Sequence, residues 1–330
     1  MVKHNQCLLH NGLAIIAILF AGCSLTDTTP GTKPDQTISG PETKQPLKAD
    51  KPTAEPKRKV LRNLEYARAG QKSLLLDLYL PKNPDQKPLP LIVWVHGGAW
   101  RKGSKNNPRA KGFTTQGYAV ASINYRLSQD AKYPAQIHDC KAAIRWLKAN
   151  AKKYNLDQNR IGAWGSSAGG HLVALLGTTG EVKELEGDLG NLQYSSRVQA
   201  VCDWYGPTDF LQGDAHALPN SRFKHSAPDS PWSQLIGAPI IQENKDKIAL
   251  ANPINFISSD DPPFLIVHGN MDDTVPYHQS VIFYEALKKA GVDVIFHTAK
   301  GSGHGFKGRN AQIVSKLVYE FFDKHLKKQK

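Results

Sequence analysis

The sequence predicts an α/β fold in which helices flank a mostly parallel central sheet. Apolar runs typical of strands alternate along the chain with stretches of helical periodicity. One run, from Leu91 to Val95, is apolar at every position, which indicates a strand buried on both faces. A second run, from Ile161 to Trp164, ends in a group of small residues and is followed by leucines at helical spacing.

The other elements follow the same alternation. Further strands are predicted at 60–66, 74–80, 119–125, 198–204, 264–267 and 292–296, and helices at 134–147, 281–287 and 313–322. Residues 205–263 are rich in proline, carry scattered aromatic side chains and are too long for a simple connection. We therefore expect an insertion or cap between the strands near 204 and 264.

Composition restricts the classes of function. With 330 residues, of which 40% are hydrophobic, the chain can bury a substantial core. The net charge of +13 is spread along the chain and forms no basic stripe with interleaved aromatic residues. This pattern argues against a nucleic-acid partner. It is compatible with a general affinity for anionic surfaces or acidic polysaccharide.

The amino-terminal region predicts export. The apolar stretch from Leu13 to Phe20 is too short to span a bilayer. Residues 1–22, which include it, fit a lipoprotein-type signal peptide. Phe-Ala-Gly-Cys at 20–23 resembles a bacterial lipobox, so we expect lipidation of Cys23 and anchoring to a bacterial membrane. The alternative is an ordinary secretory peptide and a secreted or periplasmic protein. Residues 23–57, rich in Pro, Thr and Lys, predict a disordered tether before a folded domain at 58–330.

Two cysteines remain in the predicted folded domain. Cys140 lies in a helical pattern and Cys202 in a strand pattern. In an exported protein they could form a disulfide. Two buried thiols that pack as small apolar side chains are an equally good interpretation.

A serine lies at the turn between the second apolar run and the helix after it. Residues 165–169 read Gly-Ser-Ser-Ala-Gly, which places Ser167 at the apex of a Gly-x-Ser-x-Gly turn between strand and helix. Such a turn lifts the hydroxyl clear of the sheet edge. Ser167 is therefore the candidate nucleophile, and it requires a base and an acid that orients the base.

The partners of Ser167 are predicted from the chain order Ser, acid, His. Asp272 follows the strand at 264–267 and so lies at the same sheet edge, whereas its neighbour Asp273 is expected to support the turn. Asp209 is the rival acid, which we interpret as a turn or cap carboxylate. Of the histidines after Asp272, only His304 lies in a glycine-rich loop beyond a strand. We expect it to act as general base and then general acid.

A third motif follows the strand at 91–95. It reads His-Gly-Gly-Ala-Trp at 96–100. Its small residues predict that the N–H groups of Gly98 and Ala99, with that of Ala168, face a developing oxyanion. Candidate pocket residues are the aromatics Trp100, Tyr125 and Trp232, although core packing is the commoner fate of such side chains. Histidines and cysteines lack metal-ligand spacing and there is no phosphate-binding loop, so we expect neither a metal nor a cofactor.

These motifs carry a family resemblance. The stretch 91–306 resembles the α/β-hydrolase superfamily and, more narrowly, bacterial secreted esterases of the feruloyl/carbohydrate-esterase (BD-FAE-like) group. The matching segments include His-Gly-Gly-Ala-Trp at 96–100, Asn-Tyr-Arg-Leu at 124–127, Gly-Ser-Ser-Ala-Gly-Gly-His at 165–171 and Gly-His-Gly-Phe at 303–306. Ala99 and Ser166 depart from the hormone-sensitive-lipase-like branch, which typically has Gly and Asp there.

The resemblance implies a serine carboxylic-ester hydrolase that works through a Ser-His-Asp triad and an acyl-enzyme. The implied substrate is a small-molecule or polysaccharide ester, from which acetyl or feruloyl groups are removed. Two alternatives remain open. One is a serine peptidase or an arylformamidase on the same fold, and the other is a catalytically silent binding module with this fold.

Overall fold

The computed structural model describes residues 59–82, 87–180 and 182–327. The predicted signal peptide (1–22), the proposed lipidation site Cys23 and the predicted tether (23–57) lie outside the described residues. No helix within the described ranges has the length and apolar character needed to cross a membrane.

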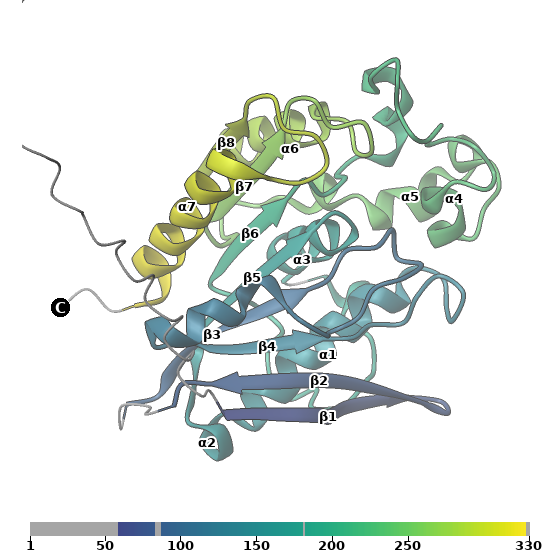
Figure 1. Cartoon of the computed structure of the whole chain (residues 1–330). Helices are drawn as coiled ribbons and strands as arrows, with labels where there is room; N and C mark the ends of the chain where they lie inside the picture. The colour runs from purple at the N-terminus through teal and green to yellow at the C-terminus, as the bar shows by residue number, and fades with distance from the viewer. Residues whose placement is uncertain (1–58, 83–86, 181, 328–330) are drawn as a thin grey trace, which may run out of the picture. The chain divides into compact units, whose positions relative to one another are not determined.

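The centre of the fold is an eight-stranded sheet in the order β1-β2-β4-β3-β5-β6-β7-β8 (Figure 1). β1 and β2 are antiparallel, β2 and β4 are antiparallel, and the neighbours from β4 to β8 are all parallel. The predicted α/β class with a mostly parallel sheet is thus confirmed. The strands are Lys59–Ala69 (β1), Lys72–Leu80 (β2), Leu89–Val95 (β3), Ala119–Ile123 (β4), Leu156–Ser166 (β5), Ala200–Trp204 (β6), Phe264–Gly269 (β7) and Val294–Ala299 (β8).

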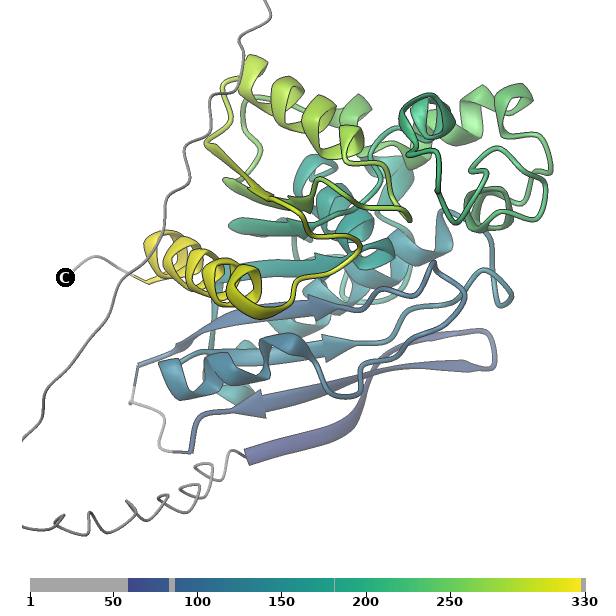
Figure 2. The same ribbon diagram turned by 45° about the horizontal axis from the view of Figure 1, so that its top comes forward.

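Helices cover both faces of the sheet (Figure 2). α1 (Ala135–Ala149), α3 (Ala168–Thr178) and α6 (His278–Lys289) contribute their apolar side chains to one core cluster. α7 (Gly308–Leu326) and the 3₁₀ helix η1 (Arg109–Gln116) contribute to a second cluster on the opposite face. β3 alternates between the clusters, with Val93 in the first and Trp94 in the second, and all its residues are buried. This is the doubly covered strand that its uninterrupted apolar run predicts.

The predicted insertion joins β6 to β7. It contains α4 (Pro231–Ile236), α5 (Lys245–Ala251) and short 3₁₀ turns, and Figure 1 shows it beyond one end of the sheet. From this position the insertion can cover the ends of the central strands. The short α2 (Ala151–Tyr154) is not part of the insertion and directly precedes β5.

The two cysteines of the described domain are free and buried. Cys140 lies in α1 and Cys202 in β6, each within a core cluster. The sequence left a disulfide and two buried thiols open, and the structure shows two buried thiols.

Strand register brings the predicted motifs to one edge of the sheet. Val95 pairs with Gly165, Gly165 pairs with Asp203, and Trp204 pairs with Val267. Because these strands are parallel, the segments that follow them leave the sheet side by side. These segments are the turn at 96–100, the Gly-x-Ser-x-Gly turn and the loop that contains Asp272.

Candidate active site

Ser167 lies in a sharp turn between β5 and α3. Its backbone has φ 57° and ψ −122°, an unfavourable conformation for a residue with a side chain. The turn is held by the Ser167 N–H, which donates to the Trp204 carbonyl oxygen at 2.8 Å. A Cβ atom placed on Gly169 would lie 2.1 Å from the carbonyl oxygen of Val95. Glycine at this position therefore allows α3 to approach the end of β3 closely.

A chain of hydrogen bonds connects Ser167, His304 and Asp272. His304 Nε2 is 2.9 Å from Ser167 Oγ, and His304 Nδ1 is 2.7 Å from Asp272 Oδ2. An ionised carboxylate can only accept, so Nδ1 carries the proton and Nε2 is free to accept from the serine hydroxyl. The structure thus brings together the three residues that the sequence predicts, in the orientation that a Ser-His-Asp triad requires.

Asp272 is buried and accepts several hydrogen bonds. Its Oδ1 accepts from the N–H groups of Thr274 (2.8 Å) and Val275 (2.9 Å), and its Oδ2 also lies 3.2 Å from His268 Nε2. Burial alone would raise the pKa of Asp272. The hydrogen bonds from His268 and His304 outweigh this effect and hold its pKa well below the usual range. Asp272 therefore faces His304 as a carboxylate.

The rival carboxylates have structural partners. Asp209 caps the 3₁₀ helix at 210–212 by accepting from the Leu211 N–H, as predicted. Asp273 Oδ1 accepts from the Thr274 hydroxyl at 3.0 Å, and its Oδ2 lies 3.1 Å from Nε of Arg222 in the insertion. Asp273 thus supports its own turn and fastens the insertion to it.

The turn at 96–100 lies against the serine. A Cβ atom placed on Gly97 would lie 2.6 Å from the Ser166 carbonyl oxygen and 3.3 Å from Ser167 Cβ. Gly98 and Ala99 both have positive φ, at 118° and 56°. They line a pocket that also contains Ser167, whereas Ala168 begins α3, where backbone N–H groups lack intrahelical partners. Two of the predicted oxyanion donors, Gly98 and Ala99, thus line the same pocket as Ser167, and the third, Ala168, directly follows the serine.

The pocket at Ser167 and His304 has a volume of about 350 Å³. We call it the serine pocket. Its remaining walls come from the segment after Ala99, from the residue after β6, from the insertion and from the loop after β7, and they include Arg101, Lys102, Tyr205, Arg222, Phe223 and Thr274. From the insertion, Trp232 was the predicted pocket residue, whereas Arg222 and Phe223 line the pocket; they were not predicted because they lie far from any motif in the sequence.

The three aromatic side chains that were predicted to line the pocket lie elsewhere. Trp100 is buried and contacts His171 and Phe210, because the positive φ values at 99 and 100 turn it inward. Tyr125 is buried and its hydroxyl donates to the His96 carbonyl oxygen at 2.9 Å. Trp232 is also buried, stacked on Phe210 at 4.6 Å between ring centroids. These residues support the site from the core.

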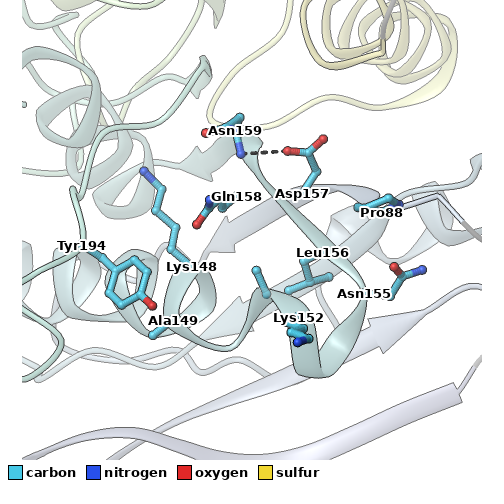
Figure 3. Close-up of a pocket in the computed structure, with 11 residues that line it drawn as sticks. Pro88, Lys148, Ala149, Lys152, Asn155, Leu156, Asp157, Gln158, Asn159 and Tyr194 are labelled. Carbon is cyan, nitrogen blue, oxygen red and sulfur yellow. Dashed lines mark hydrogen bonds between the residues drawn. The ribbon is translucent and has the colours of Figure 1, made fainter.

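A separate hollow of about 500 Å³ lies at the opposite end of β5 (Figure 3). Its lining includes Lys148, Asn155, Asp157 and Tyr194, but no serine, cysteine or histidine among the described residues. Seven residues of β5, from Arg160 to Ser166, lie between this lining and Ser167, which corresponds to roughly 25 Å of extended chain. This hollow is larger than the serine pocket, but it does not contain the nucleophile.

A second buried carboxyl group lies beneath the serine turn. Asp203 pairs with Gly165, is fully buried, and accepts a hydrogen bond from the Gly206 N–H at 2.9 Å through Oδ1. Its Oδ2 has no hydrogen-bond partner among the described residues. Burial raises the pKa of Asp203 to about 7, against the opposing effect of the Gly206 hydrogen bond.

This shift predicts a pH dependence of stability. Between pH about 4 and about 7 the folded protein retains a proton on Asp203 that the unfolded chain has released. Stability from this group is therefore complete below pH about 4 and is lost as pH rises through about 7. The loss amounts to at most about 4 kcal/mol. Urea unfolding across this range should show a flatter pH dependence for Asp203→Asn than for the wild type. The same change at the exposed Asp246 should leave the dependence unaltered, and parallel profiles for Asp203→Asn would contradict the prediction.

The fold and the site together define the class of protein. A mostly parallel sheet carries the serine after β5, the acid after β7 and the histidine after β8, which is the order of an α/β-hydrolase. The chain belongs to the BD-FAE family, whose profile matches residues 76–287. The family resemblance seen in the sequence is thus confirmed.

Comparisons with individual proteins agree with this family. The truncated form of a carbohydrate esterase from gut microbiota is 36% identical, with a TM-score of 0.72 over 82% of this chain and 99% of that one. The bifunctional GH43-CE of Bacteroides eggerthii is 37% identical, with a TM-score of 0.72 over 80% of this chain and 38% of that one. Esterase 2 of Thermogutta terrifontis, in a structure described as phosphorylated by paraoxon, is 26% identical, with a TM-score of 0.64 over 81% of this chain and 94% of that one.

Among curated proteins, the esterase LipC of Mycobacterium tuberculosis is 32% identical over 239 residues, which is 70% of this chain and 57% of LipC. The esterase LipQ and the probable carboxylic ester hydrolase LipM of the same organism are 29% and 30% identical. The match spans 60% of LipQ and 54% of LipM, against 78% and 73% of this chain. The shared region is therefore little more than half of each of these relatives.

Proposed function

We propose that this protein is a serine carboxylic-ester hydrolase that removes acetyl or feruloyl groups from polysaccharide or related esters. The observation that carries the proposal is the chain of hydrogen bonds from Ser167 through His304 to Asp272, which opens into the serine pocket. The gut carbohydrate esterase and the GH43-CE protein, both similar over about four fifths of this chain, support a carbohydrate ester as substrate.

The geometry fits a two-step acyl transfer. Ser167 Oγ attacks the ester carbonyl while its proton passes to His304 Nε2, and Asp272 stabilises the imidazolium through Nδ1. The N–H groups of Gly98, Ala99 and Ala168 are the proposed donors to the negative oxygen of the tetrahedral intermediate. His304 then protonates the leaving alcohol, and a water that it deprotonates releases the acid from Ser167.

Covalent labelling tests this proposal and separates it from a silent binding module. A fluorophosphonate probe should label the purified wild type. Ser167→Ala should abolish labelling and lower kcat for p-nitrophenyl acetate about 10⁶-fold. The control is Ser315→Ala, because Ser315 is exposed on α7 and its hydroxyl donates within its own helix, to the Ala311 carbonyl oxygen. An unlabelled wild type would support the binding module, and full hydrolysis by Ser167→Ala would refute the mechanism.

The acyl group is identified by direct comparison of substrates. Methyl ferulate, acetylated xylan and short p-nitrophenyl esters should be offered to the same preparation, with kcat/KM as the measure. Hydrolysis of acetylated xylan or methyl ferulate is expected. Hydrolysis of only the p-nitrophenyl esters would remove the carbohydrate part of the proposal and leave the esterase part intact.

A further inference from the structure

The serine pocket is cationic. Its lining contains Arg101, Lys102 and Arg222, and it contains no carboxylate side chain among the described residues. The nearest acids along the chain already have partners, since Asp272 bonds to His304 and Asp273 to Arg222. A concave site lined by one sign of charge concentrates ligands of the opposite sign.

Arg222 is positioned toward this pocket by two contacts. Its N–H donates to the Asp273 carbonyl oxygen at 2.7 Å, and its Nε lies 3.1 Å from Asp273 Oδ2. These contacts hold the insertion against the loop that carries Asp272. Because Asp273 engages Nε, the two Nη groups remain as donors for a planar anion such as a carboxylate.

Arg101 and Lys102 line the same pocket and directly follow the turn at 96–100. Their backbone N–H groups both donate to the Gly98 carbonyl oxygen at 3.1 Å, which ties their position to that turn. Arg101 Nη1 has a long contact of 3.4 Å to Gln234 Oε1. Neither side chain forms an ion pair within the part of the chain that the structure describes.

Phe223 and Tyr205 add aromatic surface to the lining of the serine pocket. Both aromatic residues line the same pocket, and Tyr205 lies 4.6 Å from His304 between ring centroids. Burial raises the pKa of Tyr205 to about 12, so its hydroxyl remains neutral. Arg222 is already paired with Asp273, but Arg101 and Lys102 have no carboxylate partner among the described residues, so the ligand is the remaining source of negative charge for them.

We infer that the serine pocket selects esters that carry a carboxylate close to the scissile bond. The inference rests on the esterase function proposed above and specifies its substrate. The carboxylate has two possible sources, the acyl half of the ester or an acidic sugar in its alcohol half. Both present the same planar anion to Arg222, Arg101 and Lys102.

Two pairs of substrates test the inference, each differing in the charge. Ethyl hydrogen succinate against ethyl butyrate places the carboxylate on the acyl half. The 3-O-acetyl methyl galacturonoside against the 3-O-acetyl methyl galactoside places it on the alcohol half. We expect kcat/KM for the charged member of at least one pair to exceed that for the neutral member about tenfold at low salt. This ratio should fall as salt is raised.

Substitutions of the cationic residues that line the serine pocket separate their local effect on substrate preference from the effect of the overall positive charge. Arg222→Gln and Lys102→Gln should each lower the charged-to-neutral ratio about three- to tenfold. The matched control is Arg68→Gln, which removes the same charge from an exposed ion pair with Glu65 on the distant edge strand β1 and should leave the ratio unchanged.

The outcomes distinguish the two proposals. A preference in the succinate pair assigns the carboxylate to the acyl half, and a preference in the galacturonoside pair assigns it to the alcohol half. Charged-to-neutral ratios near one in both pairs would overturn the inference, and so would a ratio that Arg68→Gln lowers as much as Arg222→Gln does. In either case, hydrolysis of the neutral esters would still support the esterase function. A wild type that hydrolyses none of the four esters would count against the proposed function itself.

Discussion

Replacement of Asp272 by asparagine is expected to lower kcat for p-nitrophenyl acetate about 10⁴-fold. The amide oxygen can still accept from the N–H groups of Thr274 and Val275, so the side chain should keep its place. The amide nitrogen then faces His304 Nδ1 as a donor, which forces Nδ1 to become an acceptor. The ring proton moves to Nε2, which faces Ser167 and can no longer take its proton.

The control for this prediction is the same substitution at the rival acid. Asp209 caps a 3₁₀ helix, and asparagine is an equally good cap, so Asp209→Asn should change kcat less than about threefold. Steady-state kinetics with circular dichroism as a check of folding would measure both variants. Retention of kcat within about tenfold by a folded Asp272→Asn protein would mean that another group orients His304.

The serine, the histidine and the acid could be predicted because their placement depends on chain order and strand ends. Ser167, Asp272 and His304 each follow a strand, and parallel strands deliver such residues to one edge. Strand β3 was equally predictable, since an apolar run without alternation requires cover on both faces, and the structure has a core cluster on each.

The pocket walls could not be predicted because they depend on backbone conformation and long-range contacts. Nothing in the composition of Ala99 and Trp100 reveals that both have positive φ, which turns the indole into the core and away from the pocket. Arg222 reaches the pocket through contacts with Asp273, a residue fifty-one positions later. The insertion that carries Arg222 has short helices whose periodicity is too weak to place its side chains.

The close approach of α3 to β3 is the basis of the second large prediction. A methyl group at Gly169 would lie 2.1 Å from the Val95 carbonyl oxygen and 2.7 Å from that of His96, and both are backbone atoms. Gly169→Ala must therefore push α3 away from the end of β3, which should lower the free energy of unfolding by about 3 kcal/mol. The same shift separates the turn at 96–100 from Ser167, so kcat should fall about 10²- to 10³-fold.

Gly112→Ala is the matched control, because a Cβ atom on Gly112 in η1 would meet nothing within 4 Å. Its free energy of unfolding should change by no more than about 0.5 kcal/mol. Urea unfolding and single-turnover release of p-nitrophenol would measure stability and acylation separately in both variants. If Gly169→Ala lost stability but acylated at the wild-type rate, the turn would keep its position without α3. The proposed donors Gly98 and Ala99 would then owe their placement to β3 alone, so the kinetic result decides whether the contact of α3 with β3 serves folding only or also aligns the turn with Ser167.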